Sequence, residues 1–223
     1  MNHIETGSQG FSKTYWDTNY AQPEIMDGIC NADQLAQALK TLFEVQCIDI
    51  CSIVDLGFGL GHLFKAMIDA FIPHTAIGIE PSPYAYRQLN VHTLTSIEST
   101  EIRLHHTDLL SWCLDTTPFN HGPFDLGICT SILQYLSDAE ISTAMPILAQ
   151  RVKYLYFSVP TDIELDYQVQ ELNFHDPYAL HRSKDEYHEL VSDHFTIVSN
   201  RVMESNVHFD QNSTYFYDLF YRF

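Results

Sequence analysis

The stretch Ile-Val-Asp-Leu-Gly-Phe-Gly-Leu-Gly, residues 53–61, decides the fold of this chain. It joins a short apolar run at 51–56, predicted to be a buried strand, to an apolar periodic segment at 60–71, predicted to be a helix. Glycines suit such a turn because a side chain would block a ligand from the backbone and because a tight turn can require a positive φ. The following helix would direct unpaired N–H groups and its positive end toward that ligand. The segment therefore predicts a ligand crevice at the end of a parallel strand.

Strand and helix signals alternate through most of the remaining chain. Helices are predicted at 31–45, 82–94 and 138–150, and strands at 75–79, 102–105, 124–130 and 153–159. A helix capped by Ser183 runs to about residue 194, and the aromatic and β-branched runs 195–203 and 215–223 then predict an antiparallel pair. We expect an α/β fold: a doubly wound, seven-stranded, mostly parallel sheet with helices on both faces and a C-terminal antiparallel hairpin.

An acidic residue ends the second predicted strand of this sheet. Glu80 lies 19 residues beyond Gly61, where a carboxylate can accept hydrogen bonds from both hydroxyls of a ribose. The expected ligand is therefore an adenosine-like nucleoside derivative. The glycine spacing is G-x-G-x-G, and His62 stands where the dinucleotide fingerprint would have its last glycine. This difference disfavours NAD and a nicotinamide-dependent oxidoreductase.

Residues 53–61 resemble the first motif of the class I, Rossmann-like S-adenosylmethionine-dependent methyltransferases, hydrophobic-hydrophobic-Asp-x-Gly-x-Gly-x-Gly. The resemblance implies S-adenosylmethionine as the cofactor and S-adenosylhomocysteine as its product. It further implies that Gly57 and Gly59 line the methionine part of the cofactor, that Asp55 lies beneath it, and that Glu80 holds the ribose. The implied reaction is in-line transfer of the methyl group to an acceptor.

Three further segments are similar to this family. Residues 107–110 resemble the segment whose aspartate, here Asp108, accepts a hydrogen bond from the adenine amino group. Residues 128–138 resemble the fourth-strand motif that flanks the methyl group, with Tyr135 facing the active site. Residues 15–17, with Tyr20, resemble the N-terminal helix that caps the cofactor. The predicted cofactor-binding set is Tyr15, Trp16, Asp55, Gly57, Gly59, Gly61, Glu80, Pro81, Asp108, Leu109, Thr130 and Ser131.

Some of these residues have a structural alternative. Asp108 could be an exposed helix cap, because Asp is a preferred N-cap and a short helix could start at Leu109. Tyr15 and Trp16 could be aromatic side chains that only pack against the core or surface. For Asp55, ordering of the glycine loop is the competing role.

The chain is expected to form one domain over residues 14–223, after a loose N-terminus at 1–13. Within it we expect N-terminal cap helices at 14–45 and an acceptor-binding loop at 160–183, although the part of that loop at 173–183 could be an ordinary capped loop.

Methyl transfer from a sulfonium mainly requires alignment of the reactants and exclusion of water. A base is needed only when the acceptor must lose a proton, and Tyr135, His175 and His181 are the catalytic candidates by their placement. No metal site is predicted, because the sequence has no HExxH-like spacing and no Cys/His run at zinc-finger spacing.

The amino-acid composition limits the kinds of methyl acceptor and the location that we expect for this protein. Lys and Arg total 11 against 29 Asp and Glu, a formal net charge of −18, which disfavours nucleic acid and leaves a small molecule or a protein as the methyl acceptor. Five cysteines without a CxxC pair indicate a reducing, cytoplasmic location, and no signal peptide or membrane span of roughly 18 apolar residues is predicted. The alternative function is a non-catalytic methyltransferase-like module that acts through protein contacts.

Overall fold

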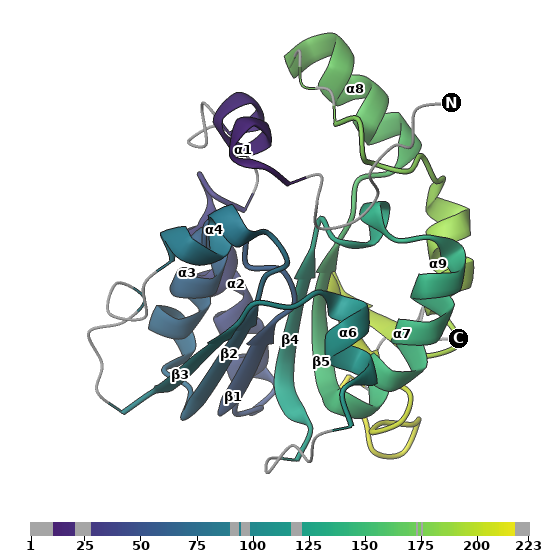
Figure 1. Ribbon diagram of the computed structural model, residues 1–223. Coiled ribbons are helices and arrows are strands. Elements are labelled where there is room, and N and C mark those ends of the chain that lie inside the picture. Colours follow the sequence, from purple (N-terminus) through teal and green to yellow (C-terminus); the bar gives the residue numbers. More distant parts are fainter. Residues whose placement is uncertain are drawn as a thin grey trace.

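The computed structural model describes residues 11–20, 28–89, 94, 99–116, 122–172, 174 and 176–216. A seven-stranded sheet in the order β3-β2-β1-β4-β5-β7-β6 forms its centre (Figure 1). The five parallel strands are β1 (Ser52–Asp55), β2 (Thr75–Ile79), β3 (Glu101–His105), β4 (Phe124–Thr130) and β5 (Val152–Ser158). The antiparallel pair is β6 (Phe195–Ser199) and β7 (Val202–Ser205), with β7 beside β5. The predicted fold class is confirmed.

Helices cover both faces of the sheet. On one side lie α2 (Ala32–Val45), α3 (His62–Phe71) and α4 (Pro83–Gln88), and on the other α6 (Leu109–Leu114), α7 (Asp138–Arg151) and α9 (Lys184–Val191) (Figure 1). Neighbouring strand residues point to opposite faces. Accordingly Ile53 packs into the cluster of α2 and α3, whereas Val54 packs into that of α6, α7 and α9. Both faces of the strand are buried here, which explains why the neighbouring residues Ile53 and Val54 are both apolar.

Serine caps start several helices where the sequence predicts them. Ser137 and Ser183 form capping boxes with Glu140 and Glu186, and Ser82 caps α4. The helix predicted at 82–94 is shorter, because α4 ends at Gln88. The next residue turns into extended backbone, and residues 90–93 lie outside the described part of the chain.

The C-terminal hairpin lies elsewhere in the sequence than predicted. The run 195–203 is broken by a turn at Asn200 and Arg201, where Arg201 adopts a φ of +58°, and its two halves pair with each other as β6 and β7. The prediction of 195–203 as one strand is therefore wrong. In its predicted partner, residues 215 and 216 form no strand, and 217–223 lie outside the described residues. The apolar pattern concealed the turn because both of its flanks are β-forming.

Three predicted boundaries also change. The segment 160–183 is not one loop, because α8 (Asp162–Leu172) occupies its first half. Residues 11 and 12 are described, and Ser12 caps α1 (Lys13–Asn19), so the predicted loose end does not reach residue 13. Of the two helices predicted as a cap, α2 belongs to the core, and only α1 stands above the sheet (Figure 1). Within the described ranges, no helix has the length and apolar character needed to cross a membrane.

Candidate functional site

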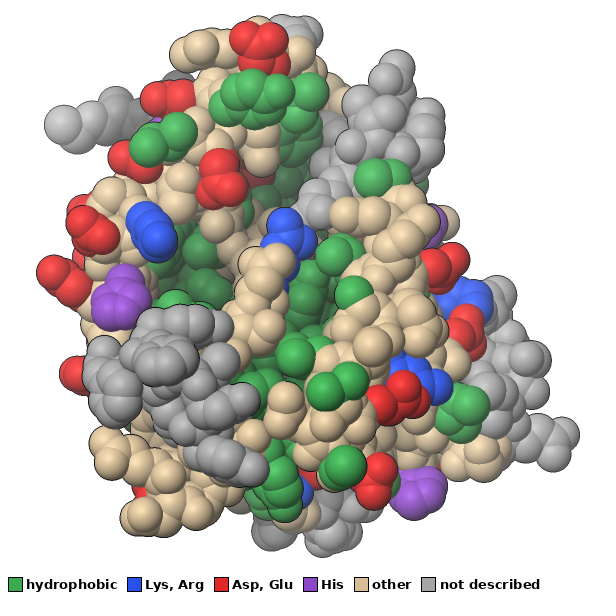
Figure 2. Space-filling model, turned by 180° about the vertical axis from the view of Figure 1, so that it is seen from behind, with side chains coloured by type: hydrophobic (Ala, Val, Ile, Leu, Met, Phe, Trp, Pro, Cys, Tyr) green, Lys and Arg blue, Asp and Glu red, His purple; other side chains and the backbone are tan. Residues whose placement is uncertain are grey.

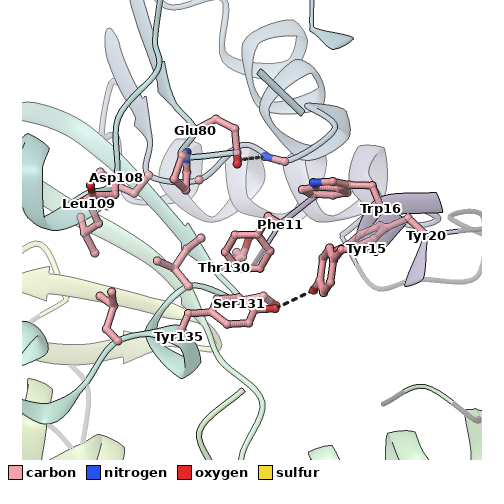
Figure 3. Close-up of a pocket in the computed structure, with 16 residues that line it drawn as sticks. Phe11, Tyr15, Trp16, Tyr20, Glu80, Asp108, Leu109, Thr130, Ser131 and Tyr135 are labelled. Atoms are coloured by element: carbon pink, nitrogen blue, oxygen red, sulfur yellow. Dashed lines mark hydrogen bonds between the residues drawn. The ribbon is translucent and has the colours of Figure 1, made fainter. Parts of the chain in front are cut away.

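A cleft opens at the carboxyl ends of β1, β2, β3 and β4, beneath α1 (Figure 3). It contains about 770 Å³ of space free of protein atoms, part of it open to solvent. The strand order reverses between β1 and β4, where a doubly wound sheet makes its ligand crevice. Its walls are formed by Phe11, Tyr15, Trp16, Tyr20, Leu56, Gly57, Gly59, Glu80, Pro81, Asp108, Leu109, Thr130, Ser131, Ile132, Tyr135 and Leu136.

Two residues of the predicted cofactor set, Asp55 and Gly61, do not line the cleft. Gly61 has a φ of +82° at the N-cap of α3, and a Cβ added to it would lie 2.5 Å from Leu89 Cδ1. Its place in the motif therefore reflects the shape of the turn and close packing. Gly59, with a φ of +55°, does line the cleft.

Asp55 lies beneath the glycine loop and is almost completely buried. Its Oδ1 accepts a hydrogen bond from the Gly57 N–H at 3.3 Å. Burial raises the pKa of Asp55 to about 8, the Gly57 N–H opposes this rise, and the nearby Glu80 carboxylate adds to it. Asp55 thus orders the glycine loop from below. This is the role that the sequence analysis gave as the alternative to contact with the cofactor.

Glu80 joins the loops that follow β1 and β2. Its side chain is 4% exposed, with Oε2 accepting from the Gly59 N–H at 2.8 Å and Oε1 from the Ser82 N–H at 2.7 Å. Burial raises the pKa of Glu80 to about 7, although these two backbone N–H groups lower it. A carboxylate offers about four lone-pair sites. Two are in use, so Glu80 retains acceptor capacity where it borders the cleft (Figure 3).

Asp108 is the helix cap that the sequence offered as one of its two roles, and it also borders the cleft. Its Oδ1 accepts from the Ser111 N–H at 2.8 Å and its Oδ2 from the Ser111 hydroxyl at 2.8 Å, so it caps α6. It also lines the cleft together with Leu109. A helix cap at this strand end therefore holds a carboxylate at the wall of the cleft.

Tyr15 and Trp16 likewise pack and line the cleft at the same time. Both are 7% exposed. The Trp16 Nε1–H donates to Ser82 Oγ at 2.9 Å, and the Ser82 hydroxyl donates to the Phe11 carbonyl at 2.9 Å. Trp16 Cη2 lies 3.4 Å from the position of a Cβ on Gly59. Through these two hydrogen bonds, Ser82 holds Phe11 and α1 over the glycine loop.

A second hydrogen-bond cluster closes the other end of the cleft. The Tyr135 hydroxyl donates to Asp176 Oδ2 at 2.6 Å, and the Tyr15 hydroxyl donates to the same oxygen at 3.0 Å. The two hydroxyls are 3.3 Å apart and face each other (Figure 3). Burial raises the pKa of both tyrosines well above the ordinary value, so neither is a ready phenolate.

The three catalytic candidates differ in their position relative to the cleft. Tyr135 lines the cleft, His181 is exposed and is not among the lining residues, and His175 lies outside the described residues. Sequence reasoning missed Phe11 and Asp176. Asp176 precedes a proline, which is a turn signal, but that signal does not say which side chains the turn will meet.

Two other features of this end could not be read from the sequence. Ser131 has a φ of +56°, held by its N–H donating to the Ser158 carbonyl at 2.8 Å, and such conformations in residues other than glycine gather at functional sites. Arg182 is buried and binds Asp138 and the carbonyl oxygens of Leu133 and Leu136. It fixes the short helix η3 (Leu133–Tyr135), and with it the position of Tyr135.

The electrostatics of the cleft are acidic. Among the described residues that line it, Glu80 and Asp108 are charged and none is Lys, Arg or His. Asp176 binds two of the lining tyrosines. Such a site favours a positively charged ligand. In the described part of the chain, no group of three or more His, Cys, Asp or Glu side chains could hold a metal ion.

Comparisons with known proteins agree with this fold and cleft. Residues 53–154 match a family model described as a methyltransferase domain. This stretch is therefore similar to a methyltransferase domain, and the solved structures that share the fold are themselves methyltransferases. No curated protein matches the chain.

Solved structures share the fold at low sequence identity. A S-adenosylmethionine-dependent methyltransferase from Clostridium acetobutylicum ATCC 824 is 12% identical with a TM-score of 0.53, covering 71% of this chain and 61% of its own length. Magnesium protoporphyrin IX methyltransferase from Synechocystis PCC 6803 with bound S-adenosylhomocysteine is 16% identical with a TM-score of 0.58, covering 89% and 96%. The plantazolicin methyltransferase BpumL, with a triazolic desmethyl-plantazolicin analogue and S-adenosylhomocysteine, is 13% identical with a TM-score of 0.61, covering 83% and 71%.

Proposed function

We propose that this chain binds S-adenosylmethionine in the cleft and transfers its methyl group to a small-molecule or protein acceptor. The observation that carries the proposal is the buried Glu80 carboxylate, which is held by the N–H groups of Gly59 and Ser82 and has acceptor capacity left at the cleft wall. The two hydroxyls of a ribose fit such a carboxylate. Two of the solved structures that share the fold contain S-adenosylhomocysteine, which supports the same ligand here.

The strand order gives the direction of the ligand along the cleft. In the sequence β3-β2-β1-β4, Asp108 follows β3, Glu80 follows β2, Gly57 follows β1, and Thr130 ends β4. We infer that the adenine lies by Asp108, the ribose by Glu80 and the methionine part over Gly57. The reacting end then points toward Thr130 and Tyr135.

The bound cofactor supplies a methyl group that is already activated by the positive charge on sulfur. The chain's own contribution is alignment and exclusion of water. Trp16 and Tyr15 cover the glycine loop from above, and Ser131 and Tyr135 border the end at which the acceptor would enter. None of these roles requires a metal ion.

Charge argues against nucleic acid as the acceptor. The net charge of −18 opposes approach to phosphate backbones. On the face that Figure 2 shows, the Lys and Arg side chains of the described residues stand apart from one another and form no continuous basic surface. We therefore favour a small molecule or a protein, in the cytoplasm, and no membrane partner.

The decisive experiment is titration calorimetry with S-adenosylmethionine, S-adenosylhomocysteine and NAD, followed by thermal unfolding. A ligand that binds only the folded state stabilises it by about 2.7 kcal/mol at 100 times its Kd. We expect both adenosyl compounds to bind and NAD to have no effect. Failure of both compounds to bind at millimolar concentration would contradict the proposal. Binding without turnover on any acceptor would favour the non-catalytic module instead.

A further inference from the structure

Three aromatic residues, Phe11, Tyr15 and Tyr135, line one end of the cleft, and Tyr178 packs against Tyr15 without lining it. The Phe11 ring lies 4.8 Å from that of Tyr135 and 5.1 Å from that of Tyr15, between centroids, and the Tyr178 ring lies 5.9 Å from that of Tyr15. Figure 3 shows Phe11 between Glu80 on one side and Tyr135 on the other. Aromatic faces attract cations as well as apolar groups.

The hydroxyl groups in this wall are arranged to accept hydrogen bonds. Tyr15 and Tyr135 each have one hydroxyl proton, and both protons point to Asp176 Oδ2, at 3.0 and 2.6 Å. Their oxygen lone pairs therefore remain for other groups. The other oxygen of Asp176 accepts from the Tyr178 N–H at 3.0 Å and has one lone-pair site left. A bound molecule must donate hydrogen bonds here, which excludes an acceptor-only group such as a carboxylate.

The charges near this wall are negative. The described cations closest in sequence to its residues are engaged elsewhere: Lys13 pairs with Asp17 on the exposed side of α1, and Arg182 is bound to Asp138 and to backbone carbonyls below η3. The Asp176 charge behind the tyrosine hydroxyls is therefore not neutralised by either of them. An anionic acceptor would be repelled, and an ammonium group would be attracted.

We propose that the methyl acceptor is an amine, whose nitrogen is held by the hydroxyls of Tyr135 and Tyr15 and whose carbon frame packs on Phe11. Tyr135 touches the nitrogen and is the catalytic residue in this scheme. Asp176 acts through the two tyrosines and is a positioning residue. This inference rests on the proposed function, because it assigns the acceptor of the same site.

The reaction balances without any further reagent. An ammonium group gives one proton to the Tyr135 oxygen while the Tyr135 proton passes to Asp176, and from Asp176 it leaves to solvent. The freed nitrogen lone pair forms a bond to the methyl carbon as the carbon–sulfur bond breaks, and that electron pair stays on sulfur. The products are a methylated ammonium ion, a neutral thioether and one released proton.

The first test measures binding rather than turnover. Calorimetric titration of the protein saturated with S-adenosylhomocysteine uses three probes of one shape: 2-phenylethylamine, 2-phenylethanol and 3-phenylpropanoate. We expect the amine to bind at least about tenfold more tightly than the alcohol, because hydrogen bonds to charged groups exceed neutral ones, and the carboxylate to bind least. An amine that binds no better than the alcohol, including the absence of measurable binding by either, overturns the amine assignment.

A matched pair of variants then locates the effect. Asp176→Asn keeps the shape of the side chain and removes its charge, and Asp166→Asn removes one exposed charge from α8 as the control. We expect Asp176→Asn to reduce the preference for the amine to less than about threefold while its affinity for S-adenosylhomocysteine stays within twofold. The control should keep the full preference. Retention of the preference in Asp176→Asn overturns the role of Asp176.

Failure of the inference and failure of the proposed function give different results. If S-adenosylhomocysteine does not bind, the proposed function fails and the acceptor assignment falls with it. If it binds and the amine has no preference, only the acceptor assignment fails. The comparison of the three probes in the unaltered protein tests the amine assignment even when Asp176→Asn does not fold. Tyr135→Phe, which removes one accepting oxygen but keeps the ring, repeats the test at the residue that is hydrogen-bonded to Asp176.

Discussion

Replacement of Glu80 by glutamine probes the centre of the proposed site. The glutamate accepts from two backbone N–H groups, those of Gly59 and Ser82, with its two oxygens. Glutamine has one accepting oxygen, so Glu80→Gln loses one of these bonds and all charge assistance toward a ribose. At about 1.5–3 kcal/mol for a hydrogen bond to a charged group, S-adenosylhomocysteine should bind about 10- to 150-fold more weakly.

The same residue makes cofactor affinity depend on pH. Burial raises the pKa of Glu80 to about 7 in the free protein, so its ionised fraction grows from about one tenth at pH 6 to about three quarters at pH 7.5. Ribose hydroxyls donate to the ionised form and lower its pKa in the complex. Affinity should therefore rise about eightfold between pH 6 and pH 7.5. Asp55, with a pKa of about 8, titrates mainly above this window.

Calorimetry at several pH values checks both effects. The unaltered protein should show the rise, and Glu80→Gln should show weak binding without it. Glu171→Gln, which removes an exposed carboxylate at the end of α8, is the matched control and should behave as the unaltered protein. An affinity of Glu80→Gln within threefold of the unaltered protein at pH 7.5, or a flat profile in the unaltered protein, would refute the reasoning.

Three further changes test the frame around the site. Burial raises the pKa of Asp55 from 3.8 to about 8 on folding, so the contribution of Asp55 to stability is most favourable below about pH 4 and becomes less favourable as the pH rises toward 8. Asp55→Asn should therefore be more stable than the unaltered protein in urea at pH 8 by at least about 1 kcal/mol, and a lower stability would contradict this. Gly61→Ala should lose about 1–2 kcal/mol because of its positive φ, whereas Gly122→Ala, whose Cβ would meet nothing within 4 Å, should be neutral in the same urea unfolding. Ser82→Ala leaves the buried Trp16 N–H without its acceptor and should cost about 1–3 kcal/mol and speed proteolytic cleavage within α1; unchanged cleavage would argue against the Ser82 link.

Local pattern was sufficient for much of the fold. The strand predictions at 75–79 and 124–130 coincide with β2 and β4, because each is an apolar run ended by polar residues or a turn. The helix starts after Ser137 and Ser183 were readable because capping involves residues only three apart. Ten of the twelve residues expected to bind a cofactor line one cleft, because the carboxyl ends of parallel strands must meet at one edge.

Other features depended on contacts between distant segments. The turn at Asn200 and Arg201 was hidden in a run that forms strands equally well as one piece or two. The length of α4 is set where Leu89 leaves the helix and packs beside Gly61, a contact that helix propensity does not encode.

The sequence by itself determined the doubly wound sheet, the glycine loop and the acidic residues at the strand ends, since each depends on periodicity, glycine chemistry or spacing within a few tens of residues. Only the tertiary structure decided that Asp176 meets Tyr135, 41 residues away, and Tyr15, 161 residues away. Such contacts follow from how helices and loops dock on the sheet, where many local arrangements satisfy the same pattern. The end of the cleft at Tyr135 therefore depends on the tertiary structure, while the residues at its other end, Glu80 and Asp108, can be recognised in the sequence.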